Sequence, residues 1–244
     1  MCHNLEIKEG AYIIADAHYS HLREELLSLI KEIHSKKLLV SQLILMGDIF
    51  DVLVGDVEHT HTSNTQMIEL INGISEFIEV LYLEGNHDYN LQKIFPKVKV
   101  FPIQSQPIIC SYKNKSICLA HGDFDGGMQY KIYTAVIRNS LSLYVLKSID
   151  TLLNHFILQK LDTYLSTKDD CKKFVGFREF VEKRLESRVA CDYFIEGHYH
   201  QNISMEFSKT SYINLGAFAC NQRYFIVKSL KDSELLKEEK FLRG

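Results

Sequence analysis

The sequence has no tryptophan, only 3 prolines and no long hydrophobic run. It contains no stretch of about 18 uncharged apolar residues, so we expect no helix that spans a membrane. The net charge is −3 and the sequence pI is about 6.4. Without a global basic field, the composition argues against nucleic acid as a partner.

The 6 cysteines are scattered, without a Cys-x-x-Cys pair or a regular spacing. Residues 1–10 also lack the basic-then-apolar layout of a secretory signal. We therefore expect reduced thiols and a cytoplasmic protein, not a disulfide framework. A bridge between Cys110 and Cys118 across a hairpin is the pairing to consider, and the expected compartment argues against it.

Apolar residues make up 46% of the 244-residue chain, which is ample for a large core. Short apolar runs alternate with stretches of helical spacing, which predicts strands over 12–15, 43–46 and 78–83 and helices over 21–39 and 65–77. This alternation is typical of a layered α/β sheet, in which ligands bind outside the carboxyl ends of the strands.

Between and after these elements the sequence predicts loops and further short strands. We expect a polar loop over 52–63 and a loosely held, charged terminus from Lys231 onward. Short strands are expected over 98–101, 107–112, 116–120, 192–196, 203–207, 211–215 and 224–227.

A change of character at residue 128 predicts a helical insertion. Residues 128–175 contain neither Gly nor Pro and keep a helical spacing of apolar residues, and a second helical pattern follows over 177–189. We therefore divide the chain into a core, residues 1–127 and 191–244, and an insertion, residues 128–190. From 131 to 190 there are 11 Lys and Arg against 7 Asp and Glu, so the insertion is basic.

Five short polar blocks follow the predicted strands. Their candidate donors are carboxylate, amide and imidazole groups: Asp16, His18, Asp48, Asn86, His121, His198 and His200. Such mixed oxygen and nitrogen donors suit two divalent ions about 3.5–4 Å apart, with Mn²⁺ favoured and Fe or Zn fitting the same set. Asp48 is the natural bridge, because each carboxylate oxygen can bind one ion.

The spacing inside two of these blocks also suggests how the donors are presented. In Asp16-Ala17-His18 and in His198-Tyr199-His200 the donors are two residues apart. In extended chain such residues point to the same side. We therefore expect each pair to serve one site from an extended segment.

The five blocks, in this order, resemble the calcineurin-like metallophosphoesterase superfamily, with its pattern D-x-H, G-D-x-x-D, G-N-H-D/E, a later H, and G-H-x-H. The resemblance spans residues 16–200. It implies a four-layer α/β/β/α sandwich with two metal ions at the sheet edge, and hydrolysis by a metal-bound hydroxide that attacks phosphorus. It implies a first ion on Asp16, His18 and His200, a second on Asn86, His121 and His198, and Asp48 between them.

The same resemblance suggests roles for the remaining polar residues. His87 would act beside the leaving oxygen or the developing charge, oriented by Asp88 through its other ring nitrogen. Asp51 would support the Asp48 loop rather than bind metal. Asp123 would either orient His121 or cap a turn.

Within the superfamily, the chain is similar to the UDP-2,3-diacylglucosamine diphosphatases of the lipid A pathway. The similarity rests on chain length, on His121-Gly122-Asp123 leading into the insertion, on Tyr130-Lys131 early in it, and on the strands after His200. It implies a pyrophosphatase that releases UMP and a lipid monophosphate, whose insertion is a cap for the acyl chains. Asn86, Tyr130 and Lys131 would contact the substrate. One departure is His87, where that family characteristically carries Arg.

Two other functions stay open. A soluble phosphodiesterase or phosphatase for nucleotides or other phosphate esters would have a polar, shallower cleft in place of an apolar one. A scaffold protein would typically have lost metal ligands, whereas the donors named above are all present. For the lipid enzyme we expect a cytoplasmic protein, with attachment to the surface of the inner membrane through the basic, apolar insertion as a further expectation.

Overall fold

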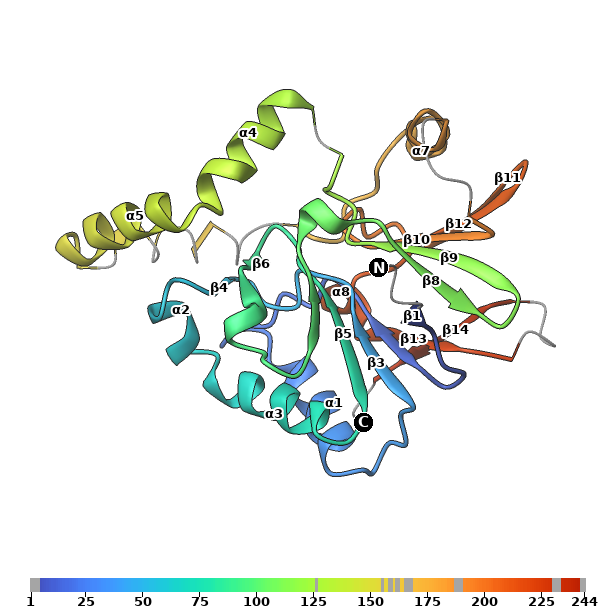
Figure 1. The fold of residues 1–244 in the computed structure, drawn as a ribbon, viewed down its shortest axis with the longest axis horizontal. Coiled ribbons are helices and arrows are strands. Elements are labelled where there is room, and N and C mark those ends of the chain that lie inside the picture. The colour runs from blue at the N-terminus through green and yellow to red at the C-terminus, as the bar shows by residue number, and fades with distance from the viewer. Residues whose placement is uncertain are drawn as a thin grey trace.

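Two large mixed sheets packed face to face form the body of the molecule (Figure 1). The computed structural model describes residues 5–241 except 126, 155, 158–159, 161–162, 165–168, 187–190 and 230–233. Each of the two sheets has six strands, and a two-stranded sheet accompanies them.

One large sheet holds the first three predicted strands side by side in parallel. Its order is β14-β13-β2-β3-β5-β7, with β2 (Tyr12–Ile14), β3 (Gln42–Leu45), β5 (Glu79–Leu83), β7 (Lys99–Phe101), β13 (Arg223–Val227) and β14 (Leu236–Lys240). Strand β3 is buried at every position, as expected for a parallel strand covered on both faces.

The second large sheet has the order β1-β8-β9-β10-β12-β11. Its strands are β1 (Leu5–Glu6), β8 (Ile108–Tyr112), β9 (Lys115–Ala120), β10 (Tyr193–Glu196), β11 (Ile203–Phe207) and β12 (Thr210–Asn214). Between the two sheets lies an apolar core to which Ile13, Ile44 and Leu81 contribute from one side and Leu119 and Ile195 from the other.

Helices cover the outer faces of both sheets. Helices α1 (Glu25–His34) and α3 (Thr65–Ser75) pack their apolar stripes, with Leu29 and Ile71 fully buried, on the first sheet. On the second sheet, α7 (Phe177–Leu185) packs Val181 against Phe194 and Tyr212. The layers therefore run α/β/β/α, and the predicted fold class is confirmed.

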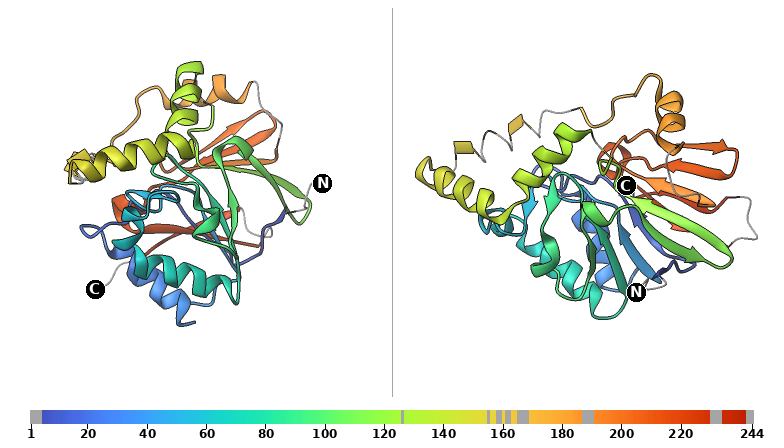
Figure 2. Two further views of the ribbon diagram at one scale, coloured as in Figure 1. Left: turned by 60° about the vertical axis from the view of Figure 1, so that its left-hand side comes forward. Right: turned by 45° about the horizontal axis from the view of Figure 1, so that its top comes forward.

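The predicted insertion has two differently placed parts. Helices α4 (Met128–Ile137) and α5 (Ser140–Leu152) extend away from the sheets, whereas α7 lies on them (Figures 1 and 2). The boundaries of the insertion stay a prediction. No helix in the described ranges combines the length and the apolar character needed to cross a membrane.

Two predicted loops turn out to hold regular structure. Residues 52–63 contain β4 (Leu53–Val54), which pairs with β6 (Asp88–Tyr89), and α2 (His59–Thr62). The charged terminus contains β14, which pairs antiparallel with β13. Both predictions were wrong because long-range pairing, not local apolar spacing, forms these strands. The remaining short elements are η1 (Leu91–Lys93), η2 (Ile103–Ser105) and α8 (Phe218–Asn221).

The prediction of reduced thiols is also contradicted. The structure pairs Cys118 with Cys191 and Cys171 with Cys220, and Cys110 is free. The partners are 73 and 49 residues apart in the chain. No local spacing could have indicated such pairs.

The core between the sheets can be tested with a pair of aliphatic truncations. Leu119→Ala removes a fully buried side chain and should lower the free energy of unfolding by about 2–5 kcal/mol. Ile109→Ala, on β8, changes a side chain that is 54% exposed and should have a much smaller effect. Urea unfolding of both variants checks this, and equal losses would show that the inter-sheet packing is misassigned.

Candidate metal centre

The carboxyl ends of five strands from the two large sheets bring the predicted donors together. Strands β2, β3 and β5 run parallel and are followed by Asp16, Asp48 and Asn86. Strands β9 and β10 are parallel in the other sheet and are followed by His121 and His198. Because parallel strands end at a common edge, all these side chains meet where the sheets meet.

A first donor group consists of Asp16, His18 and His200. One donor atom of each lies within 4.8 Å of the others. The shortest contact joins His200 Nε2 to Asp16 Oδ1 at 3.1 Å. Three donors this close together could hold a divalent cation.

A second donor group lies beside the first. Asp48, His121 and His198 meet the same 4.8 Å criterion. His121 Nε2 lies 3.4 Å from Asp48 Oδ2 and 3.3 Å from Asn86 Oδ1, so the Asn86 amide joins this group. Since His121 Nδ1 also lies 4.0 Å from Asp16 Oδ1, the two groups are neighbours.

The histidine rings are oriented as metal ligands require. His121 Nδ1 donates to the Met46 carbonyl at 2.9 Å, and His200 Nδ1 donates to the Asp170 carbonyl at 2.5 Å. His18 Nδ1 lies 3.3 Å from Asp51 Oδ1, and its Nε2 is buried without a hydrogen-bond partner. Holding one ring nitrogen on an acceptor leaves the other free for a cation. The residues present therefore fit two divalent ions.

The backbone at these donors is left-handed, not extended. The φ angles are 50° at Asp16, 47° at His18, 49° at Asp48, 60° at His198 and 57° at His200. The expectation that each pair is presented by extended chain was therefore wrong. Non-glycine residues in this region cost of order 1 kcal/mol or more each, and such strain gathers at functional sites.

Two glycines make room for the carboxylates. A Cβ on Gly85 would collide with the Asp48 side chain, and a Cβ on Gly197 would collide with Asp16. Glycine is therefore required beside Asn86 and His198 because a carboxylate occupies the space of a side chain. The sequence shows these glycines but not the groups that they accommodate.

The electrostatics keep the carboxylates charged. Burial raises the pKa of Asp48, but His121 and His87 outweigh it and hold the pKa well below its ordinary value. Burial lowers the pKa of His200, but Asp16 outweighs it and raises the pKa to about 9. Burial and the neighbouring His121 lower the pKa of His198 to about 4, so this imidazole is neutral and able to bind a cation.

The predicted pairing of His87 with Asp88 is contradicted. His87 Nδ1 donates to the Asp51 carbonyl at 2.9 Å, and its Nε2 faces Asp48 Oδ2 at 3.9 Å. Asp88 instead accepts N–H groups from Asp48 at 3.0 Å and Ile49 at 2.6 Å. Burial and the charge of Asp48 raise the pKa of Asp88 to about 7. Asp88 thus supports the loop that carries Asp48.

Other predicted roles are also corrected. Asp51 contacts His18 and His87 and so supports the histidines rather than the Asp48 loop alone. Asp123 accepts from Tyr130 Oη at 2.7 Å, whereas the ring of His121 is oriented by the Met46 carbonyl, so Asp123 does not take the predicted role of orienting His121. The turn cap at Asp123 stays a prediction. The contact of Tyr130 with substrate stays a prediction, and the Lys131 side chain lies outside the described side chains.

Comparison with protein-family models gives a match to the calcineurin-like phosphoesterases over residues 11–202. The chain belongs to this family. The match covers all seven donor residues and the helices between them. The members of this family use two divalent metal ions, in agreement with the two donor groups.

The chain is also similar to individual proteins. It is 23% identical over 169 residues to a UDP-2,3-diacylglucosamine hydrolase of Pseudomonas fluorescens, and the match spans 66% of each chain, just under two thirds. It is 22% identical over 200 residues to one of Histophilus somni, spanning 79% of this chain and 85% of that protein. An archaeal phosphodiesterase structure has a TM-score of 0.48 at 13% identity, covering 94% and 98%. A dimetal phosphatase structure from Danio rerio has a TM-score of 0.44 at 14% identity, covering 91% and 94%.

Two buried arginines that reach this centre were missed in the sequence. Arg138 donates to the Gly85 carbonyl at 2.7 Å, and Arg184 donates to the Gly122 carbonyl at 2.6 Å. Both come from the insertion, where their spacing on amphipathic helices looks like that of solvated surface residues. Only their contacts with the glycines beside Asn86 and His121 distinguish Arg138 and Arg184 from surface arginines.

Metal binding should release protons. His200 has a pKa of about 9, so at pH 7.5 it is protonated and must lose the proton from Nε2 to bind a cation. Calorimetric titration with Mn²⁺ at pH 7.5 in two buffers of different ionisation enthalpy should therefore show net proton release. An observed enthalpy that is independent of the buffer would contradict this assignment of His200.

Proposed function

We propose that this protein hydrolyses the diphosphate of a UDP-linked diacyl sugar, UDP-2,3-diacylglucosamine, to UMP and a lipid monophosphate. Membership of the calcineurin-like phosphoesterase family supports the reaction class. The relatives named UDP-2,3-diacylglucosamine hydrolases support the substrate. The observation that carries the proposal is an apolar cavity that opens beside the metal centre.

The residues of the two donor groups would hold the cations. Asp16, His18 and His200 would hold one ion, Asn86, His121 and His198 would hold the other, and Asp48 would contribute to both. Two bound divalent ions, most suitably Mn²⁺, would supply the nucleophile from water and neutralise charge on phosphorus.

The ring of His87 is placed to act on the reacting phosphate. Its Nδ1 proton is fixed on the Asp51 carbonyl, so Nε2 faces the centre. When protonated, Nε2 can donate to a phosphate oxygen or to the leaving oxygen. The His87 side chain is 7% exposed, so water competes little for this position.

The apolar cavity starts at the metal centre and runs under the insertion. It has a volume of about 340 Å³, and its lining includes Asn86 and His87 at the metal end. Val54, Val57 and Tyr89 line it from the core, and Leu143 and Leu146 line it from α5. Such a cavity suits an acyl chain that is attached to a phosphate at the metals, and it favours a lipid over a nucleotide monoester.

The outer surface of α4 and α5 also suits a lipid substrate. Leu141 is 72% exposed, Tyr144 68% and Leu152 83%. Exposed apolar side chains on projecting helices can enter the headgroup region of a bilayer. They support a peripheral contact between the insertion and the membrane that holds the substrate.

Turnover tests the proposal directly. After removal of metals with a chelator and addition of Mn²⁺, the protein should release UMP from UDP-2,3-diacylglucosamine and cleave bis-p-nitrophenyl phosphate. Asp48→Ala should lose both activities and both ions, because Asp48 serves both donor groups. Cleavage of the generic diester alone would reject the lipid substrate. Full activity of the Asp48 variant would reject the site.

The cavity can be tested separately from the metals. Leu143→Glu places a carboxylate at a position of the apolar lining that is 5% exposed and should lower kcat/KM for the lipid by about tenfold or more, since burying a charge there is costly. Cleavage of the small generic diester should stay unchanged. Ser148→Glu is the matched control, because Ser148 is exposed on the same helix. Equal losses in both variants would show that the cavity does not hold the acyl chain.

A further inference from the structure

We propose that Arg138 and Arg184 are positioning residues that hold the second donor group, and that the insertion thereby controls occupancy of the second metal position. The second donor group is Asp48, Asn86, His121 and His198. This inference rests on the proposed function, because it assigns that group to a metal ion. It concerns residues of the insertion that do not themselves donate to the cation.

Arg184 joins the two loops that follow β9 and β10. Its Nη2 donates to the Gly122 carbonyl at 2.6 Å, directly after His121. Its Nη1 donates to Tyr199 Oη at 2.5 Å, directly after His198. Tyr199 Oη donates in turn to the Gly122 carbonyl at 3.1 Å. One guanidinium group therefore fixes the chain beside both histidines of the second donor group.

The surroundings of Arg184 make it rigid. Its side chain is 5% exposed, and it forms ion pairs with Asp125 at 2.8 Å and with Glu196 at 2.9 Å. The guanidinium lies 4.9 Å from the ring centre of Phe124 and 5.8 Å from that of Phe180. A planar fork of N–H groups can satisfy these partners together, whereas a lysine ammonium cannot.

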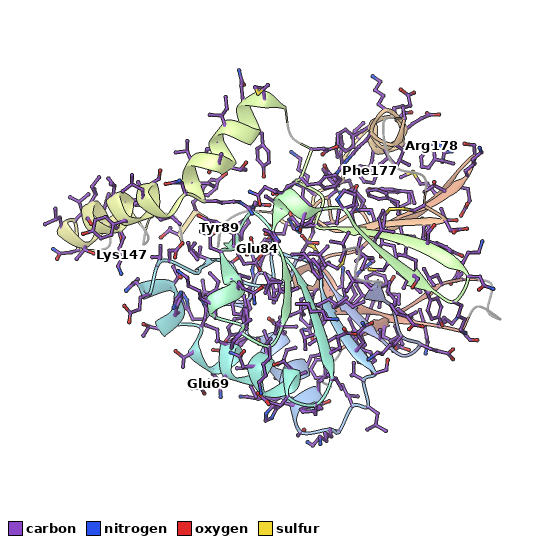
Figure 3. The ribbon with its side chains drawn as sticks, in the orientation of Figure 1. Glu69, Glu84, Tyr89, Lys147, Phe177 and Arg178 are labelled. Atoms are coloured by element: carbon purple, nitrogen blue, oxygen red, sulfur yellow. A yellow bond between two sulfur atoms is a disulfide. The ribbon has the colours of Figure 1, made fainter. Side chains whose placement is uncertain are left out.

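Arg138 makes the corresponding contact beside Asn86, another member of the second donor group. It lies at the end of α4, with its side chain 5% exposed, and donates to the Gly85 carbonyl at 2.7 Å, directly before Asn86. Its guanidinium also lies 3.7 Å from Glu84 and 3.8 Å from Asp123. It stacks on Tyr89 at 4.9 Å, and Figure 3 labels Glu84 and Tyr89 near the carboxyl end of β5.

The first donor group is held in a different way. Its contact with the insertion runs through the backbone carbonyl of Asp170, which accepts from His200. Asp170 is itself held by Arg23 of the core, at 2.5 Å. Loss of either insertion arginine should therefore affect the second metal position more than the first. Groups that orient metal ligands typically contribute about 10–100-fold to metal affinity.

The test is a Mn²⁺ titration of Arg138→Lys and Arg184→Lys. Lysine keeps the positive charge beside the buried carboxylates, so the fold is retained while the fork of N–H groups is lost. Free Mn²⁺ is followed by electron paramagnetic resonance, and two neighbouring bound ions also give a spin-coupled signal. We expect each variant to bind one ion as the wild type does, to bind the second about 10–100-fold more weakly, and to lose the coupled signal at limiting Mn²⁺.

Two further variants control the experiment. Arg178→Lys changes an exposed arginine on the same helix as Arg184, labelled in Figure 3, and should bind both ions normally. Tyr199→Phe removes the hydroxyl that accepts from Arg184 and leaves the charge of Arg184 in place. It should weaken binding of the same ion, and so tests this contact without a lysine substitution.

Unchanged binding of both ions, or equal weakening of both, would overturn this inference and leave the proposed function intact. A wild-type protein that binds fewer than two ions would reject the two-metal proposal itself.

Discussion

Everything around the candidate centre depends on keeping one buried carboxylate charged. The Asp48 side chain is 3% exposed where the two sheets meet, and burial alone would favour its protonated form. His121 and His87 lower its pKa, and the backbone N–H of His87 donates to Asp48 Oδ1 at 2.9 Å. Asp48 itself has a left-handed backbone with φ 49°, and the absence of a Cβ at Gly85 leaves room for its carboxylate. A metal pair would take over the same neutralising role.

The fold and the donors could be predicted because both depend on local patterns. Each parallel strand is a short apolar run, so Asp16, Asp48 and Asn86 could be placed at one sheet edge from their positions after β2, β3 and β5. The parallel pairing of β9 with β10 extends the argument to His121 and His198. Both donor groups assemble from these predicted residues.

Features that rest on long-range contacts could not be predicted. The contact between His87 and the Asp51 carbonyl depends on the pairing of β4 with β6, whose strands are only two residues long. The left-handed backbone at the donors has no sequence signal, because glycine does not occupy those positions. Arg184 differs from a surface arginine because α7 packs on the second sheet and places it against the loops that carry His121 and His198, a long-range contact.

We infer that two divalent ions occupy the two donor groups. Anomalous diffraction from crystals grown with Mn²⁺ tests it most directly. We expect two anomalous peaks about 3.5–4 Å apart, one among Asp16, His18 and His200 and one among Asp48, His121 and His198. His18, Asp51 and His87 form a third cluster of possible donors. A single peak in that cluster, or no peak at saturating Mn²⁺, would contradict the account.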